Sequence, residues 1–222
     1  MKFKFQHLAP IALTVLVFFS CSKKNENSSL TYKLKTGNRS AVVNRLMAGA
    51  INWTSGSAYV AKIEFEAEKD DINQIEYTAL INRRINLFAT ITELSSINLP
   101  DGKYDEIETE IELAPAPADT AFVLHGTFTN SAAQSTPVLF YINQQLELKD
   151  EAENVTINGG GQNRIAITEL TLSLLTQNVT ESMLNSATRT GGVIIISENS
   201  NASIYNIMLN AIHNIDSVEI DD

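Results

Sequence analysis

The stretch from Tyr104 to Leu113 reads YDEIETEIEL and decides the fold class of this chain. Glutamates stand at every second position from 106 to 112, and Ile107, Thr109 and Ile111 stand between them. This strict alternation is typical of a β-strand that has one face in the core and the other face in solvent. We therefore take residues 104–113 as a half-buried strand with an acidic outer face.

Period-two patterns recur on both sides of this strand. The clearest lies at residues 57–67, where we expect one face to carry Tyr59, Ala61, Ile63, Phe65 and Ala67. Further strands are expected at residues 74–79, 83–88, 121–129, 137–149, 164–176 and 193–196. Residues 178–187 and 202–213 instead have helical spacing. The chain is thus predicted to be mainly β, an antiparallel β-sandwich with one or two short C-terminal helices.

A motif at the start of the strand expected at residues 104–113 resembles one found in a known family. Residues 99–104 read LPDGKY, and residues 84–88 read RINLF. Together they resemble an uncharacterised bacterial lipoprotein domain with an I-D-L … L-P-x-G-x-Y pattern, although Asn86 stands where aspartate is frequent. The resemblance covers about residues 48–115. It implies a prealbumin-like or immunoglobulin-like β-sandwich, and it implies no activity and no functional residues.

The N-terminus has the layout of a lipoprotein signal peptide. Lys2 and Lys4 precede an apolar run that ends at Phe19, and this run is shorter than the roughly 20 residues of a membrane-spanning helix. Residues 17–21, VFFSC, resemble a lipobox, with phenylalanines bulkier than the usual residues before the cysteine. We expect residues 1–20 to be cleaved and Cys21, the single cysteine, to be lipidated, for example with palmitate.

The residues after Cys21 are small and polar, so residues 21–30 are predicted to form a flexible tether and residues 31–222 a single β-sandwich-type domain. In lipoproteins sorted to the cell outer membrane, the residue after the cysteine is usually not aspartate, and Ser22 resembles this pattern. Tethers of surface-exported lipoproteins tend to be acidic, whereas this one begins with Lys23 and Lys24. We therefore expect a lipid anchor in the outer membrane, with the periplasmic face slightly favoured over the cell surface.

The charge of the chain limits its partners. The formal net charge is −10, and it becomes −12 when Lys2 and Lys4 leave with the signal peptide. A chain this acidic offers no basic stripe for phosphates, which excludes nucleic acid as a partner. With Cys21 acylated, no thiol remains for a disulfide or a thiolate metal site.

Two sets of residues are candidates for binding. The acidic strand faces carry Glu64, Glu66 and Glu68 in one strand and Glu106, Glu108, Glu110 and Glu112 in another. They form either a solvated surface, with cross-strand partners such as Lys62 or Arg83, or a negative patch for calcium or a basic protein. Trp53 and Tyr59 are candidate ligand contacts, because exposed aromatic rings stack on sugars.

The sequence contains no catalytic motif, no cofactor-binding motif and no metal-ligand spacing. The leading hypothesis is a lipid-anchored, non-catalytic envelope module that binds a protein or glycan partner. One alternative is a carboxylate-dependent enzyme that acts on polysaccharide, because folding can bring two carboxylates together from distant residues. Another is a purely structural envelope lipoprotein.

Overall fold

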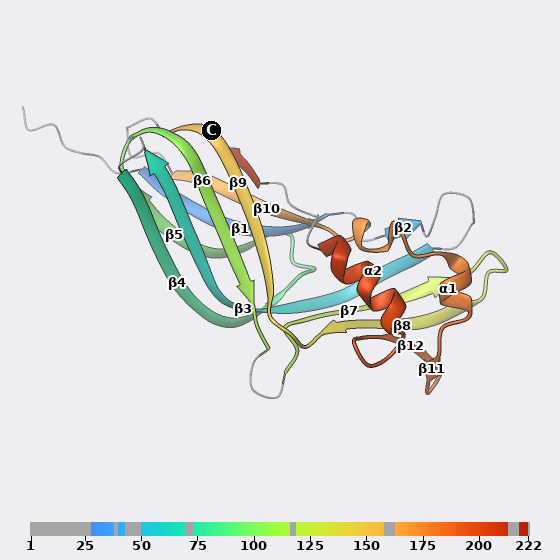
Figure 1. Cartoon of the computed structure of the whole chain (residues 1–222). Coiled ribbons are helices and arrows are strands. Elements are labelled where there is room, and N and C mark those ends of the chain that lie inside the picture. The colour runs from blue at the N-terminus through green and yellow to red at the C-terminus, as the bar shows by residue number, and fades with distance from the viewer. Residues whose placement is uncertain are drawn as a thin grey trace, which may run out of the picture.

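The computed structural model describes residues 28–37, 40–42, 50–69, 73–115, 119–157, 163–212 and 218–221. It is a mainly β protein with two sheets and few helices, which confirms the predicted fold class (Figure 1). The strands are β1 (Ser28–Gly37), β2 (Ser40–Val42), β3 (Ala50–Lys69), β4 (Asn73–Asn86), β5 (Thr92–Leu99), β6 (Gly102–Leu113), β7 (Phe122–Thr129), β8 (Ser135–Ile142), β9 (Leu146–Ile157), β10 (Asn163–Thr171), β11 (Arg189–Thr190), β12 (Val193–Ile196) and β13 (Val218–Asp221). The helices are η1 (Leu174–Thr176), α1 (Glu181–Asn185) and α2 (Ala202–Ile212).

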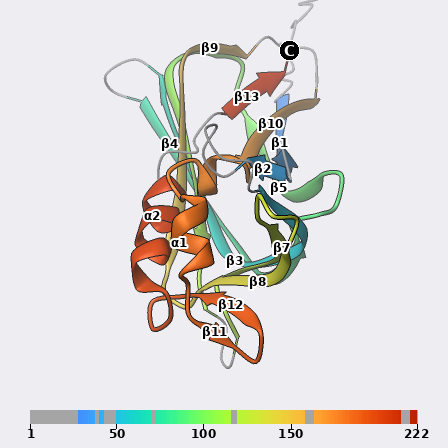
Figure 2. The ribbon, with the colours of Figure 1, turned by 90° about the vertical axis from the view of Figure 1, so that its right-hand side faces the viewer.

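The long strand β3 joins the two halves of the molecule. Its first half, from Ala50 to Ala58, pairs with β7, and its second half, from Ser57 to Lys69, pairs with β4 and β6. The second half belongs to a sandwich, in which β4, β3, β6 and β9 face the smaller sheet β13-β10-β1-β5 (Figure 1). In the other half, α1 and α2 lie on one face of β7, β8 and β12 (Figure 2), and η1 packs against α2.

The core is one continuous cluster that runs through both halves. In the sandwich, the rings of Tyr32 on β1 and Phe65 on β3 lie 5.9 Å apart across the two sheets. In the helical half, Phe140 on β8 lies 6.1 Å from Tyr205 on α2. Aromatic pairs at these distances stabilise the contact between layers beyond the area that they bury.

Two pairs of strands are parallel, which differs from the predicted all-antiparallel arrangement. β1 pairs with β10 and β12 pairs with β8 in the parallel direction. The strands of each pair are far apart in the chain, so long connections can return each one to the same end of its sheet.

β1 begins at Ser28, inside the segment predicted to be tether. Ser28, Leu30 and Tyr32 are buried, because β1 is the second strand from the β5 edge of its sheet, between β5 and β10. Residues 28–30 therefore belong to a strand and not to the predicted tether. The predicted signal peptide, Cys21 and the rest of the predicted tether lie outside the described residues.

The LPDGKY motif forms the turn that carries the chain from β5 in one sheet to β6 in the other. The side chain of Tyr104 is fully buried, and its hydroxyl donates a hydrogen bond to the Pro100 carbonyl at 2.5 Å. The Lys69 ammonium donates to the Asp101 carbonyl at 3.0 Å and lies 5.9 Å from the centre of the Tyr104 ring. The motif thus has a structural role, because these contacts hold the turn between β5 and β6 in place.

A β-bulge changes the predicted faces of β3. The register shifts between Val60 and Lys62, so Ala61 is an extra residue opposite β6. Opposite β4 the shift runs the other way, because two residues of β4, Ile81 and Asn82, stand against Ala61. Ala58 and Val60 are buried before the bulge, and odd-numbered residues from Ile63 to Ala67 are buried after it. The prediction that Tyr59 shares a face with Ile63 is therefore wrong, because alternation alone does not show an inserted residue.

Both C-terminal helices are present. Thr180 caps α1, and its hydroxyl accepts a hydrogen bond from the Met183 N–H at 3.2 Å. The Glu181 side chain is buried, and it accepts hydrogen bonds from the N–H and hydroxyl of Ser131, both at 2.8 Å. These hydrogen bonds lower the pKa of Glu181 and fasten the β7–β8 turn to α1.

Among the described residues, no helix has both the length and the apolar character needed to cross a membrane.

Candidate functional site: an acidic sheet face

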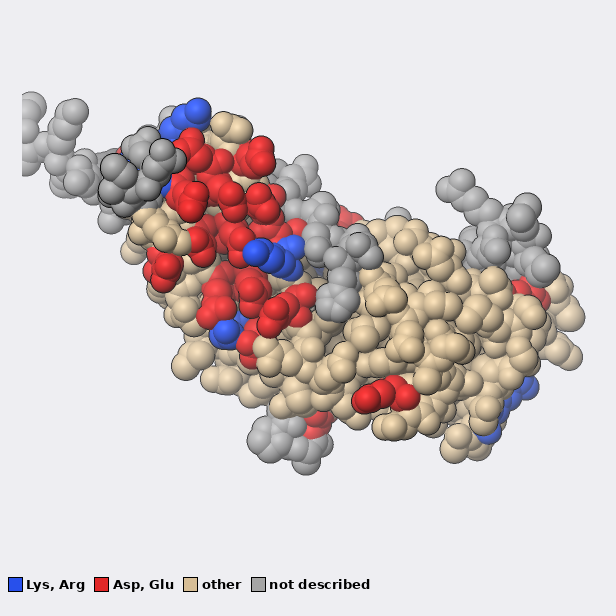
Figure 3. Space-filling model, in the orientation of Figure 1, with Lys and Arg blue, Asp and Glu red and all other residues tan. Residues whose placement is uncertain are grey.

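The outward side of the sandwich strands β4, β3, β6 and β9 carries eleven glutamates. The strand register places them on one face: one from β4, three from β3, four from β6 and three from β9. We call this surface the acidic face; it consists of Glu64, Glu66, Glu68, Glu76, Glu106, Glu108, Glu110, Glu112, Glu147, Glu151 and Glu153. Figure 3 shows acidic side chains over the sandwich half, whereas the helical half is almost uncharged on this side.

The glutamates form rows across the strands. Glu76, Glu66, Glu108 and Glu151 are successive partners on β4, β3, β6 and β9. Neighbouring strands are about 4.8 Å apart, and alternate residues along a strand are about 7 Å apart. Like charges directly opposite each other destabilise a sheet, so this arrangement costs folding free energy.

Two lysines offset part of this charge. The Lys62 ammonium lies 2.8 Å from a Glu64 oxygen and 3.2 Å from a Glu112 oxygen. The Lys149 ammonium lies 2.7 Å from a Glu108 oxygen. Lys62 thus has the predicted role, whereas Arg83 does not, because its guanidinium donates to the Glu93 carbonyl on β5.

The remaining repulsion perturbs individual carboxyl groups. The charge of Glu151 is the main cause of a raised pKa at Glu106, with burial and further glutamates adding to it. At Glu110, partial burial is the main cause of the raised pKa, followed by the charges of Glu147 and Glu64. At Glu106 the shift reflects repulsion between carboxylates, which a nearby positive charge would relieve.

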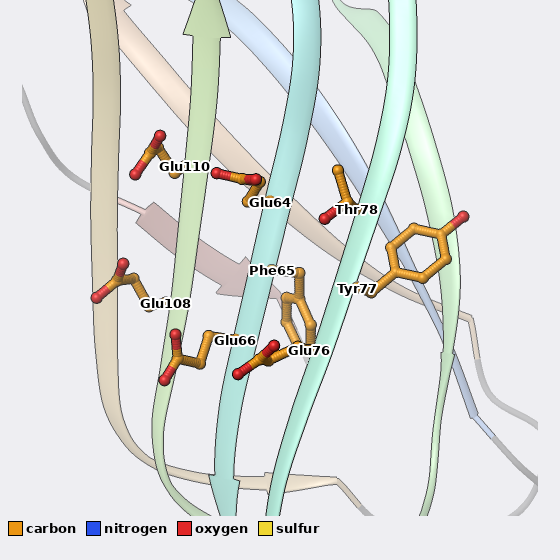
Figure 4. Close-up of a pocket in the computed structure, with 8 residues that line it drawn as sticks. All are labelled: Glu64, Phe65, Glu66, Glu76, Tyr77, Thr78, Glu108 and Glu110. Carbon is orange, nitrogen blue, oxygen red and sulfur yellow. The ribbon is translucent and has the colours of Figure 1, made fainter.

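A shallow hollow of about 290 Å³ lies on this face, at the β4 side. Figure 4 shows that Glu76 of β4 extends across β3 and that Glu66 of β3 extends toward β6, while Tyr77 points away past the edge of the sheet. The carboxylates are spread in rows rather than gathered around one point. Within the described residues, no three histidine, cysteine, aspartate or glutamate side chains are placed to hold a metal ion.

The arrangement of these carboxylates suits the binding of a partner across a wide surface better than the catalysis of a reaction. A carboxylate-dependent glycosidase needs two carboxyl groups on opposite sides of a bond held in a cleft. Here the carboxylates lie side by side on an open sheet, and Glu64 has 41% of its side chain exposed. Rows of charge on an open sheet can hold a partner with several positive groups.

The structure removes one predicted ligand contact. Trp53 lies in the part of β3 that pairs with β7 and is only 2% exposed, so its ring face is not accessible to a sugar. Tyr59 is half-buried, and its N–H donates to the Ala121 carbonyl at 2.8 Å. The two residues are six positions apart in β3 and form no common aromatic platform. Cys21 lies outside the described residues.

The sequence also contained a signal for the glutamates of β9. Leu146, Leu148 and Asp150 are buried, and the residues that alternate with them point outward. The segment was instead expected to join the preceding strand as one unit of residues 137–149. The structure ends β8 at Ile142 and starts β9 at Leu146, so β9 pairs with β6 while β8 pairs with β7.

Comparison with protein-family models, with curated proteins and with solved structures gives no match for this chain. The role of the acidic face is therefore inferred from its geometry alone.

We expect Glu110→Gln to increase the free energy of unfolding. The change removes repulsion with Glu147 and Glu64, and Glu110 has no lysine within salt-bridge distance in the described structure. The gain is about 0.2 to 0.5 kcal/mol at low salt, because solvent screens an exposed face. Urea denaturation measures it. Glu112→Gln is the matched control, since it removes an ion pair with Lys62; an equal gain in both variants would contradict the assigned pairing.

Proposed function

We propose that this chain is a lipid-anchored protein of the cell envelope, attached through Cys21, that binds a positively charged protein partner through its acidic face. The outer membrane is the proposed location, with the periplasmic side slightly favoured. The observation that supports the binding role is the concentration of eleven glutamates on four adjacent strands, with salt bridges to only two lysines among the described residues.

Repulsion among these glutamates lowers the free energy of unfolding, and a positively charged partner would relieve it. The raised pKa of Glu106 supports this reading, since its main cause is the charge of Glu151 and an added positive charge would offset that repulsion. A protein partner is favoured over a glycan because Trp53, the residue expected to stack on a sugar, is buried. The face extends over several rows, which suits a macromolecular surface.

The anchor is tested by Cys21→Ala. We expect this variant to move from the membrane fraction to the soluble fraction, because acylation at this thiol is the proposed membrane attachment. Fractionation and immunoblotting of cells that express each form measure the change. Cys21→Ser is a second variant that also lacks the thiol and should behave alike. Retention of either variant in the membrane fraction at the wild-type level would refute the anchor.

The acidic face is tested with an oligolysine peptide as the probe. We expect the full-length chain to bind it, and Glu106→Gln combined with Glu110→Gln to weaken binding several-fold. The matched control is Glu169→Gln combined with Glu198→Gln, which changes the net charge equally but lies off the acidic face. Calorimetry at low and high salt measures the affinities. Equal weakening in both double variants would indicate attraction to net charge alone and would contradict the assignment of the site.

A further inference from the structure

The strand β4 has a free edge. It spans 14 residues and pairs with β3 along nearly its whole length. Among the described residues, no strand pairs with its other edge, so a row of backbone N–H and C=O groups faces outward there. Long unprotected edges are uncommon in soluble proteins, because they pair readily with other extended chains.

This edge also carries the exposed apolar side chains of the described structure. Leu80 is 75% exposed and Tyr77 is 42% exposed, and Ile91 in the connection to β5 is 41% exposed. A second hollow, of about 460 Å³, lies beside the edge and is lined by Leu80, Ile81 and Leu94 together with Arg83 and Glu93. The hollow on the acidic face reaches the same strand through Glu76 and Thr78.

We propose that the partner contributes an extended segment that adds to β4 as a new strand, and that this segment alternates basic with apolar residues. The proposal rests on the function proposed above and names the element by which the partner binds. Main-chain hydrogen bonds to the β4 edge would supply affinity, and the alternating side chains would supply specificity.

The faces of β4 determine this pattern. Its even-numbered residues lie on the acidic face, so outward side chains of an added strand would lie about 4.8 Å from Glu76 and Thr78. A lysine or arginine there reaches Glu76 and, through its long stem, the row that begins with Glu66. The odd-numbered residues Ile75 and Tyr77 lie on the opposite face, where the added strand needs apolar side chains.

A second copy of this chain is the poorer occupant. Pairing β4 with β4 of another copy would continue one sheet into the next and bring two acidic faces side by side. Each copy contributes eleven glutamates, so the joined surface would concentrate repulsion rather than relieve it. Charge complementarity therefore favours a basic partner segment.

The test uses the full-length chain and two synthetic peptides of about nine residues, the length of an ordinary strand, in which lysine alternates with valine. The second peptide has the same side chains, but its backbone amides are N-methylated and cannot pair with a strand. We expect the first peptide to bind about tenfold more tightly, because the second loses several main-chain hydrogen bonds. We also expect the first peptide, when bound, to slow amide hydrogen exchange within residues 73–86.

A protein variant provides an independent check. Tyr77→Ser combined with Leu80→Ser removes exposed apolar side chains from the edge, so it should weaken the first peptide several-fold and leave stability nearly unchanged. Equal affinity of the two peptides without protection of β4 would refute strand addition and leave the acidic-face function intact. Failure of both peptides and of oligolysine to bind would refute both proposals.

Discussion

Trp53→Ala is expected to lower the free energy of unfolding by about 3 to 5 kcal/mol, the range found when large buried aromatic side chains are truncated. Trp53 on β3 lies opposite Gly126 on the antiparallel strand β7, and it is 2% exposed. Its removal would leave a cavity in the core beside these two strands. Because Trp53 is the only tryptophan, urea unfolding should be followed by far-ultraviolet circular dichroism rather than by fluorescence.

Two control variants separate the possible causes of the stability loss in Trp53→Ala. Trp53→Phe should cost less, since it keeps most of the ring volume and removes an indole N–H that is buried without a hydrogen-bond partner in the described structure. Tyr77→Ala should cost about 1 kcal/mol or less, because Tyr77 is an exposed aromatic residue of the same sheet. A loss below about 1 kcal/mol for Trp53→Ala would place the ring at the surface and restore the sugar-contact hypothesis.

Gly126→Ala is the second substitution expected to destabilise the fold strongly. A Cβ atom at Gly126 would lie 2.7 Å from the Asn52 carbonyl oxygen and 2.8 Å from a ring carbon of Trp53. Neither neighbour can move freely, because one is backbone within a strand and the other is packed in the core. We expect a loss of about 2 to 3 kcal/mol from this overpacking, measured by urea denaturation.

Gly37→Ala is the matched control. A Cβ atom at Gly37 would meet the carboxyl end of the Glu169 side chain, which can rotate away into solvent. The control should therefore leave the free energy of unfolding within about 0.5 kcal/mol of the wild type. Equal losses in the two variants would show that the cost comes from placing alanine in a strand and not from the close contact of Gly126 with Asn52 and Trp53 on β3.

The sequence predicted the strand type of most segments, because alternation in strands such as β6 directly reflects one buried and one solvated face. It did not predict where β3 changes partners. The bulges at Thr54 and Ala61 each insert one residue, and nothing in the local pattern distinguishes an inserted residue from a regular one. Trp53, a candidate ligand contact from the sequence, is instead buried in the part of β3 that pairs with β7.

The sequence predicted only part of the acidic face. Alternation along β3 and β6 predicted two rows of outward glutamates, and the register of the pairing was needed to place them against each other. The contribution of Glu76 and of the β9 glutamates depends on which strands are neighbours, a long-range property set by the whole core. The free edge of β4 is likewise a property of the sheet order.

The position of β1 has a mechanical consequence. β1 is the first described strand after the proposed lipid attachment, and it is bonded along its length to β10 on one side and to β5 on the other. A pull on the proposed membrane tether, directed along the axis of β1, would load these bonds together in shear, rather than opening them one after another. The β1 end of the sandwich would therefore resist unfolding by such a pull, while the β4 edge stays free to engage and release the proposed partner.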